Sequence, residues 1–280
     1  MHSTMVVSPP PHGALIRVAG ADAESFLQGQ LSHDMRALGA DRATLSSLNG
    51  PKGRVLATLV VLRVGDEVGL LAAPDIAEAM LKRLRMFVLR SKVTLTLEEA
   101  PVGGLVATGD AAQEADWAVV HDGDGWRIRA PGHPARWWVP GTARHGADTT
   151  DPDAFAAADI AAGLPCIGAA QTEAHVAQHI GLQHFGALAF DKGCFTGQEV
   201  IARLHFRGGV NRMPVRLRGP GAAPDPGSTL RNADGKAMAE VVNSVATTDG
   251  CEVLAVWRGT EPPESMETDE ARFTALPFTR

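Results

Sequence analysis

The 280-residue chain contains no tyrosine, few aromatic residues and only three cysteines. Cys166, Cys194 and Cys251 form no Cys-x-x-Cys pair and leave an odd count. This excludes the disulfide framework of a small secreted protein and favours a reducing compartment. No apolar run approaches the roughly 18 residues that a membrane span needs. Because Met1 to Pro11 also lacks the pattern of a secretory or transit signal, we expect a cytoplasmic protein with no membrane partner.

Positive charge is not in excess either. The formal net charge is -6, so the chain as a whole does not attract phosphate backbones, and we expect no direct stable nucleic-acid binding. The densest basic run is interpreted as a solvated helix face, although it could receive RNA or a polyglutamate tail. That run consists of Lys82, Arg83, Arg85, Arg90 and Lys92.

Nucleotide-binding glycine loops and the Gly-x-Ser-x-Gly pattern of serine hydrolases are also missing. What is present is typical of a soluble globular protein, with 45% hydrophobic and 21% charged residues. The length predicts two or three compact units.

The order of strand and helix signals predicts an α+β protein rather than a parallel βαβ series. Helices are expected over 22–29, from Pro74 to about Arg90, over 152–163 and over 196–206. The chain from Glu261 onward is expected to be irregular. Strands are expected over 54–64, 68–72, 93–97, 104–107, 118–120, 126–129, 136–139, 215–218, 237–245 and 251–257.

Residues 192–199, with the sequence KGCFTGQE, place a thiol between a lysine and the expected start of a helix. Thr196 lies three residues before a glutamate, as in a capping box, and is predicted to cap that helix. A cation and a helix start favour the reactive thiolate of Cys194. Gly193 and Gly197 would let a backbone or a ligand approach closely. The other interpretation is a small, buried, unreactive cysteine in a glycine-rich turn.

Three histidines raise the alternative of a metal site. His175 and His179 are four residues apart and would share a face of a helix, with His184 nearby. However, no cysteine pair or His-Glu motif supplies the further ligands that zinc needs, and a stable iron–sulfur cluster usually needs four thiolates. We therefore expect no metal ligands and interpret the segment as a partly exposed loop rich in histidine.

The string KGCFTGQEVIAR, residues 192–203, resembles the signature of the YgfZ family. These are folate-binding proteins related to the T-protein (GcvT), the aminomethyltransferase of the glycine cleavage system. The resemblance extends to 159–165, through Gln178 and Leu182 to 207–212, and near the N-terminus to 22–31 and 53–54, whereas the β segments after Arg212 fit more loosely.

The resemblance implies a three-domain, GcvT-like ring around a central cavity. Its first domain would be split, comprising 1–48 and 145–210, and would carry the KGCFTGQE motif. A ferredoxin-like α+β domain would occupy 49–144, and a small C-terminal β barrel 211–280.

The resemblance also implies tetrahydrofolate, or a one-carbon derivative, as the cofactor. It further implies a role in assembling or repairing iron–sulfur clusters in client enzymes, including radical enzymes that modify tRNA. Cys194 and Lys192 match the family's motif cysteine and lysine and are predicted to be catalytic. The predicted folate-binding residues are Gly193, Phe195, Gly197, Gln198, Glu199, Arg203, Arg54 and Gln178.

The chain departs from the family pattern at several positions. Phe195 replaces the usual tyrosine, so no phenolic hydroxyl can be required, and Ala177 and Gly181 replace a common proline and asparagine. T-proteins place an acid near His179, and its absence weighs against the first alternative, a T-protein-like aminomethyltransferase that transfers a one-carbon unit to tetrahydrofolate. The other alternative is a non-catalytic folate-binding scaffold. Whether the protein is a folate-dependent transferase is therefore left open.

Overall fold

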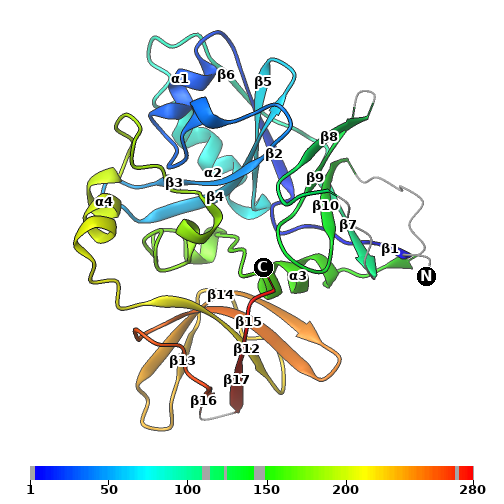
Figure 1. Cartoon of the computed structure of the whole chain (residues 1–280), viewed down its shortest axis with the longest axis vertical. Helices are drawn as coiled ribbons and strands as arrows, with labels where there is room; N and C mark the ends of the chain where they lie inside the picture. The colour runs from blue at the N-terminus through cyan, green and yellow to red at the C-terminus, as the bar shows by residue number, and fades with distance from the viewer. Residues whose placement is uncertain (1–3, 109–113, 123–124, 142–148, 269–270, 280) are drawn as a thin grey trace.

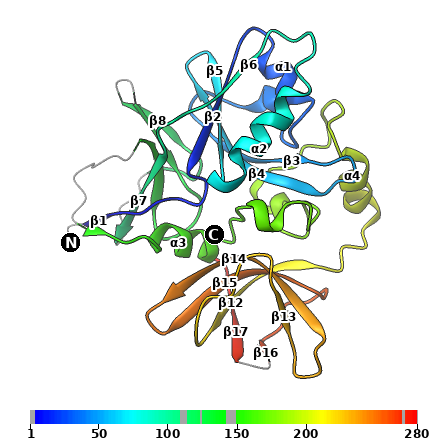
Figure 2. The ribbon, with the colours of Figure 1, turned by 180° about the vertical axis from the view of Figure 1, so that it is seen from behind.

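A computed structural model describes residues 4–108, 114–122, 125–141, 149–268 and 271–279. These residues form three sheets with short helices, and the chain between α3 and α4 crosses the space between the sheets (Figures 1 and 2). The C-terminal sheet lies at one end of the long axis, and the sheet that carries α1 and α2 lies at the other (Figure 1). The predicted α+β class is confirmed.

The first sheet, the β4 sheet, has the strand order β3-β4-β5-β2-β6, and all neighbours are antiparallel. Alternate residues of β4 face opposite sides. Leu59 and Val61 pack with the helices, whereas Val60 and Leu62 join the central core. Both faces are therefore buried. The elements are β2 (Ala14–Ala19), α1 (Ala23–Gln28), β3 (Thr44–Asn49), β4 (Val55–Val64), β5 (Glu67–Ala72), α2 (Pro74–Arg85) and β6 (Thr94–Leu97).

Helix α2 begins at Pro74 as predicted but ends earlier than expected. Its apolar face buries Ile76, Met80 and Leu84, and the chain then leaves the helix after Arg85. The prediction that the helix continues to about Arg90 is wrong, because the chain turns after Arg85 and leaves Phe87 39% exposed.

The second sheet, the β7 sheet, has the order β11-β1-β7-β10-β9-β8 and contains one parallel pair, β1 with β11. Helix α3 (Ala154–Ala162) packs against β7 and ends at Gly163, whose φ of +72° suits glycine. Trp138 and Phe155 join helix and sheet, with ring centroids 5.5 Å apart. The strands are β1 (Thr4–Val7), β7 (Val102–Thr108), β8 (Val119–Asp122), β9 (Gly125–Arg129), β10 (Arg136–Pro140) and β11 (Thr149–Thr150).

The C-terminal sheet curls into a half barrel with the order β13-β14-β15-β12-β17-β16. The prediction that the chain after Glu261 is irregular is wrong. Strand β17 pairs with β12, and Phe273 and Met266 are buried in the sheet's own core. The strands are β12 (Met213–Gly219), β13 (Thr229–Arg231), β14 (Ala237–Thr247), β15 (Gly250–Trp257), β16 (Ser265–Glu267) and β17 (Arg272–Leu276).

The predicted domain boundaries stay predictions. The predicted boundary between residues 48 and 49 falls inside strand β3, which pairs with β4 in one sheet. The boundary at 144–145 lies outside the described residues.

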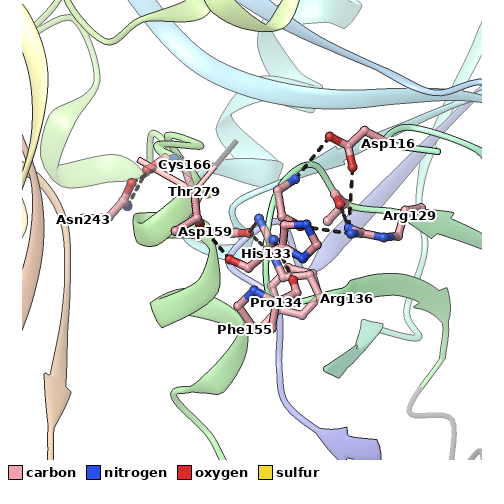
Figure 3. A network of polar contacts seen from close by, with 12 residues as sticks. Asp116, Arg129, His133, Pro134, Arg136, Phe155, Asp159, Cys166, Asn243 and Thr279 are labelled. Atoms are coloured by element: carbon pink, nitrogen blue, oxygen red, sulfur yellow. Dashed lines mark hydrogen bonds and ion pairs between the residues drawn. The ribbon is translucent and has the colours of Figure 1, made fainter. Parts of the chain in front are cut away.

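A polar network joins α3 to the two flanking sheets (Figure 3). The buried Arg136 of β10 donates from Nε to Asp159 Oδ1 at 2.7 Å. Asn243 of β14 exchanges two hydrogen bonds with the backbone of Cys166, at 2.8 and 2.9 Å. Thr279 donates from its backbone N to Ala161 O at 2.8 Å. The C-terminal sheet is therefore fixed against the central segment that leads to the motif.

Candidate functional site

The KGCFTGQE motif enters helix α4 (Gln198–Arg207) through a left-handed glycine. Gly197 is the N-cap with φ +83°, and no side chain caps the helix, so the prediction that Thr196 does so is wrong. A Cβ on Gly197 would lie 2.6 Å from Gly50 O, and one on Gly53 would lie 2.6 Å from Val200 Cβ. The close approach predicted for Gly197 is thus to protein backbone, whereas a Cβ on Gly193 would meet nothing within 4 Å.

Cys194 is exposed, while Cys166 and Cys251 are buried. Burial raises the pKa of the Cys166 thiol well above its usual range and that of Cys251 in the same direction. The interpretation of Cys194 as a small buried side chain is therefore wrong. Of the three thiols, Cys194 is the one that a partner can reach.

Lys192 ties the motif to a distant part of the chain. Its Nζ donates to Leu31 O and to His33 O, each at 2.7 Å, and lies 5.1 Å from the centroid of the Phe195 ring. Burial lowers the pKa of Lys192 to about 8, against the opposing charge of Asp34. The amino group is thus held between the segment before β3 and the ring that follows the thiol.

The remaining motif residues predicted to bind folate do not line one common cavity among the described residues: Glu199 and Arg203 border an open hollow of about 310 Å³ on α4. Phe195 is 6% exposed and packs in the central core. The Gln198 backbone N donates to Phe195 O at 3.1 Å. Glu199 and Arg203 form an exposed ion pair at 2.7 Å along α4, a kind that contributes little to stability.

Gln178 occupies a more enclosed position. It is 4% exposed, and its Nε2 donates to Ile201 O of α4 at 2.7 Å. Its Oε1 is buried and has no hydrogen-bond partner among the described residues. The side chain lines a cavity of about 290 Å³ between the central segment and the C-terminal sheet, together with Arg212 and the apolar Met213 and Phe278.

Beside Gln178 lies a charged cluster that the sequence did not reveal. His175 Nδ1 is 3.6 Å from Glu240 Oε2, and Arg212 and Arg258 both contact Glu240 Oε1. Burial lowers the pKa of His175 and of His179 to about 4, so both rings are neutral at pH 7. Burial would raise the pKa of Glu240, but the hydrogen bond from Arg258 and the nearby charges lower it.

Arg54 borders this cluster. Its guanidinium donates to Ala174 O, and its backbone forms a bridge with Val176. Its charge contributes to the lowered pKa of His175 and His179. The structure thus brings Arg54 and the Gln178 segment together, while Glu240 comes from β14, far along the chain. In the described residues, no group of three His, Cys, Asp or Glu side chains is placed to hold a metal ion.

No family model matches the chain. The tRNA-modifying protein YgfZ of Escherichia coli O45:K1 is 27% identical over 297 aligned residues, covering 95% of this chain and 91% of that protein. The protein of the same name from Enterobacter sp. strain 638 is 29% identical and covers 78% of this chain and 73% of its own length. The predicted resemblance to the YgfZ family is confirmed.

The YgfZ-like chain also has a solved structural neighbour. The glycine cleavage system aminomethyltransferase T from Bartonella henselae superposes with a TM-score of 0.76 at 15% identity. The match covers 98% of this chain and 85% of the neighbour. The fold is therefore that of the T-protein. No helix in the described parts of the YgfZ-like chain is long and apolar enough to cross a membrane.

Proposed function

We propose that this protein is a cytoplasmic, folate-binding accessory factor for iron–sulfur enzymes that modify tRNA, with Cys194 as its reactive thiol. Relatives similar over most of its length are named tRNA-modifying proteins. The exposed Cys194 lies in the motif that matches the YgfZ signature. A thiol at the surface suits a reaction with a group that a partner protein presents, such as a cluster or its ligands.

The observation that carries the folate assignment is that Gln178, whose buried Oε1 has no hydrogen-bond partner, lines the 290 Å³ cavity. A buried acceptor without a donor costs about 1–3 kcal/mol, so a ligand N–H placed there would be favoured. Arg212 supplies a cation, and Met213 and Phe278 supply apolar walls. The volume lies at the low end for ligand pockets and suits one heterocyclic end of the cofactor. When bound, tetrahydrofolate would supply the nitrogens that carry a one-carbon unit.

Calorimetric titration with tetrahydrofolate tests this assignment. We expect wild-type protein and Cys194→Ala to bind equally, because residues 192–199 do not line the cavity. Gln178→Leu should bind at least fivefold more weakly, the equivalent of one hydrogen bond of about 1 kcal/mol. Lys52→Gln, at an exposed position on the turn before β4, serves as the surface control. Wild-type protein that does not bind tetrahydrofolate would refute the assignment.

The role of the thiol is tested in a deletion strain. We expect Cys194→Ala to fold normally and to fail to restore iron–sulfur-dependent tRNA modification. Cys166→Ala should restore it if the variant remains folded, because Cys166 is buried. Full rescue by Cys194→Ala would leave a folate-binding scaffold as the better description.

Glu240 favours one second candidate, aminomethyl transfer to tetrahydrofolate. Its carboxylate lies beside His175 and contributes to the electrostatic environment of His179, so an acid reaches this region from another element. The same carboxylate is held by Arg212 and Arg258, which argues for a structural role. A glycine-cleavage assay with purified partner proteins decides, because formation of methylenetetrahydrofolate would favour the transferase.

A further inference from the structure

An exposed apolar surface follows helix α2. Four large hydrophobic side chains are exposed in the described part of the chain, and three of them lie within four residues: Met86 at 66%, Phe87 at 39% and Leu89 at 86%. The chain turns immediately after α2, with Phe87 N donating to Leu84 O at 3.0 Å. We call residues 82–92 the α2 surface.

The α2 surface is also strongly cationic. Its Lys82, Arg85, Arg90 and Lys92 are exposed, and no acidic residue occurs between Glu78 and Glu98. The chain as a whole has a net charge of -6, so this is a local reversal of sign. A surface of this kind attracts an anionic partner even when the total charge does not.

The backbone of the α2 surface is pinned. Lys92 N donates to Asp22 Oδ2 at 2.7 Å, and Asp22 N donates to Lys92 O at 3.4 Å. The Arg83 guanidinium lies 5.7 Å from the centroid of the Phe87 ring. The cations and the ring are therefore presented on a fixed support at the start of α1, and little ordering is needed on binding.

We propose that the α2 surface binds RNA, with phosphates on the exposed cations and an unstacked base on Phe87. Aromatic rings beside arginines are the usual platform for single-stranded segments, and stacking adds affinity without strict sequence preference. Met86 and Leu89 would flank the base. The inference uses the proposed link to tRNA modification only in its choice of tRNA as the RNA.

The surface belongs to the part of the molecule that also holds the motif. It follows α2 on the β4 sheet, at the end opposite the C-terminal sheet (Figure 1). Lys192 binds the carbonyls of Leu31 and His33 just before β3 of the same sheet. RNA bound here would lie on the sheet to which Lys192 ties the Cys194 loop.

The test measures binding of an unmodified tRNA transcript by fluorescence anisotropy between 50 and 200 mM KCl. Arg90→Glu/Lys92→Glu should weaken binding at least tenfold. The slope of the logarithm of the binding constant against the logarithm of the salt concentration should become shallower by about 2, because one counterion fewer is released for each cation lost. Arg231→Glu/Lys236→Glu, in exposed positions of the C-terminal sheet, makes the same change in net charge and should bind within twofold of wild type. Phe87→Ser should weaken binding and leave the salt slope unchanged.

Three results would overturn the proposal: no binding of tRNA by wild-type protein at 50 mM KCl, equal loss in both double variants, or retention of tRNA binding by Arg90→Glu/Lys92→Glu. Charge-sensitive binding to phosphatidylglycerol vesicles or to an acidic peptide without tRNA binding would assign the surface to another partner and also refute it. Tetrahydrofolate titration of the same variants should be unchanged. A failure of RNA binding can therefore be told apart from a failure of the proposed function.

Discussion

Replacing Lys192 by methionine tests whether its amino group holds the motif loop in place. The amino group donates to two backbone carbonyls at 2.7 Å each. A hydrogen bond to a charged group contributes about 1.5–3 kcal/mol. Because the Lys192 amino group is half-buried and partly screened by solvent, we expect its two hydrogen bonds to contribute about 2 kcal/mol together. A loss of that size shifts the equilibrium between the held and the released loop about 30-fold, because 1.4 kcal/mol corresponds to a factor of ten.

Hydrogen exchange measures this release directly. In Lys192→Met, amides in the peptide covering 187–197 should exchange about 30-fold faster by local opening, while amides of the C-terminal sheet should be unchanged. Lys52→Met removes an exposed lysine from the turn against which Gly197 packs and serves as the control. Lys192→Arg, which can still donate, should show an intermediate effect. Unchanged protection of the loop in Lys192→Met would refute the tethering role and return Lys192 to a direct action on the thiol.

Three further predictions concern stability. Gly197→Ala should lower the free energy of unfolding in urea by about 2–3 kcal/mol, because φ is +83° and the new Cβ meets Gly50 O. Gly193→Ala should change it by no more than about 0.5 kcal/mol, and equal losses in the two variants would contradict the packing of Gly197. The pKa of His175 is about 4 in the fold and 6.5 in a free histidine, so protonation of this ring opposes folding. The free energy of unfolding should therefore fall by up to about 3 kcal/mol as the pH drops from 6.5 to 4. In His175→Gln the melting temperature should depend less on pH, and an unchanged pH dependence would show that His175 is not the group responsible. Burial raises the pKa of Asp159 to about 6, so this carboxyl is ionised at pH 8. At that pH, Asp159→Asn should lower the free energy of unfolding by about 3–5 kcal/mol, because it leaves the buried Arg136 without its ion-pair partner. A loss below about 1 kcal/mol would argue against that ion pair.

The local signals in the sequence predicted many of the elements. Pro74 predicted the start of α2, and Gly163 the end of α3. Each is a signal whose physical effect acts within a few residues, through a left-handed turn or a fixed φ. Such effects are present in the sequence whatever the rest of the chain does.

Contacts between distant segments account for the errors. The capping-box spacing at Thr196 is genuine, but the turn at 50–53 packs against the motif and makes Gly197 the N-cap. The weak pattern around Phe273 becomes strand β17 only because β12 offers it an edge. Tertiary packing decided both cases, and no window of neighbouring residues contains that information.

In the candidate site, too, some residues could be identified from local sequence signals and others only from contacts between distant segments. The motif residues and Gln178 could be named from the sequence because the resemblance marks them. Glu240 could not, since it lies on β14 and reaches His175 only after the C-terminal sheet has docked on the central segment. Asn243, three residues further along β14, fixes that docking through its two hydrogen bonds with Cys166.

The position of Gln178 places the proposed folate site apart from the proposed thiol chemistry but links the two through helix α4. Its Nε2 donates to Ile201 O of α4, its Oε1 is buried without a hydrogen-bond partner, and the residue lines the cavity. Cys194, four residues before α4, is exposed and is not part of that wall. A ligand that binds Gln178 would therefore contact a residue that is hydrogen-bonded to α4, the helix after the thiol, without contacting the thiol itself. This arrangement requires that loss of Cys194 leaves folate affinity intact, whereas an active site with both groups in one pocket would lose both together.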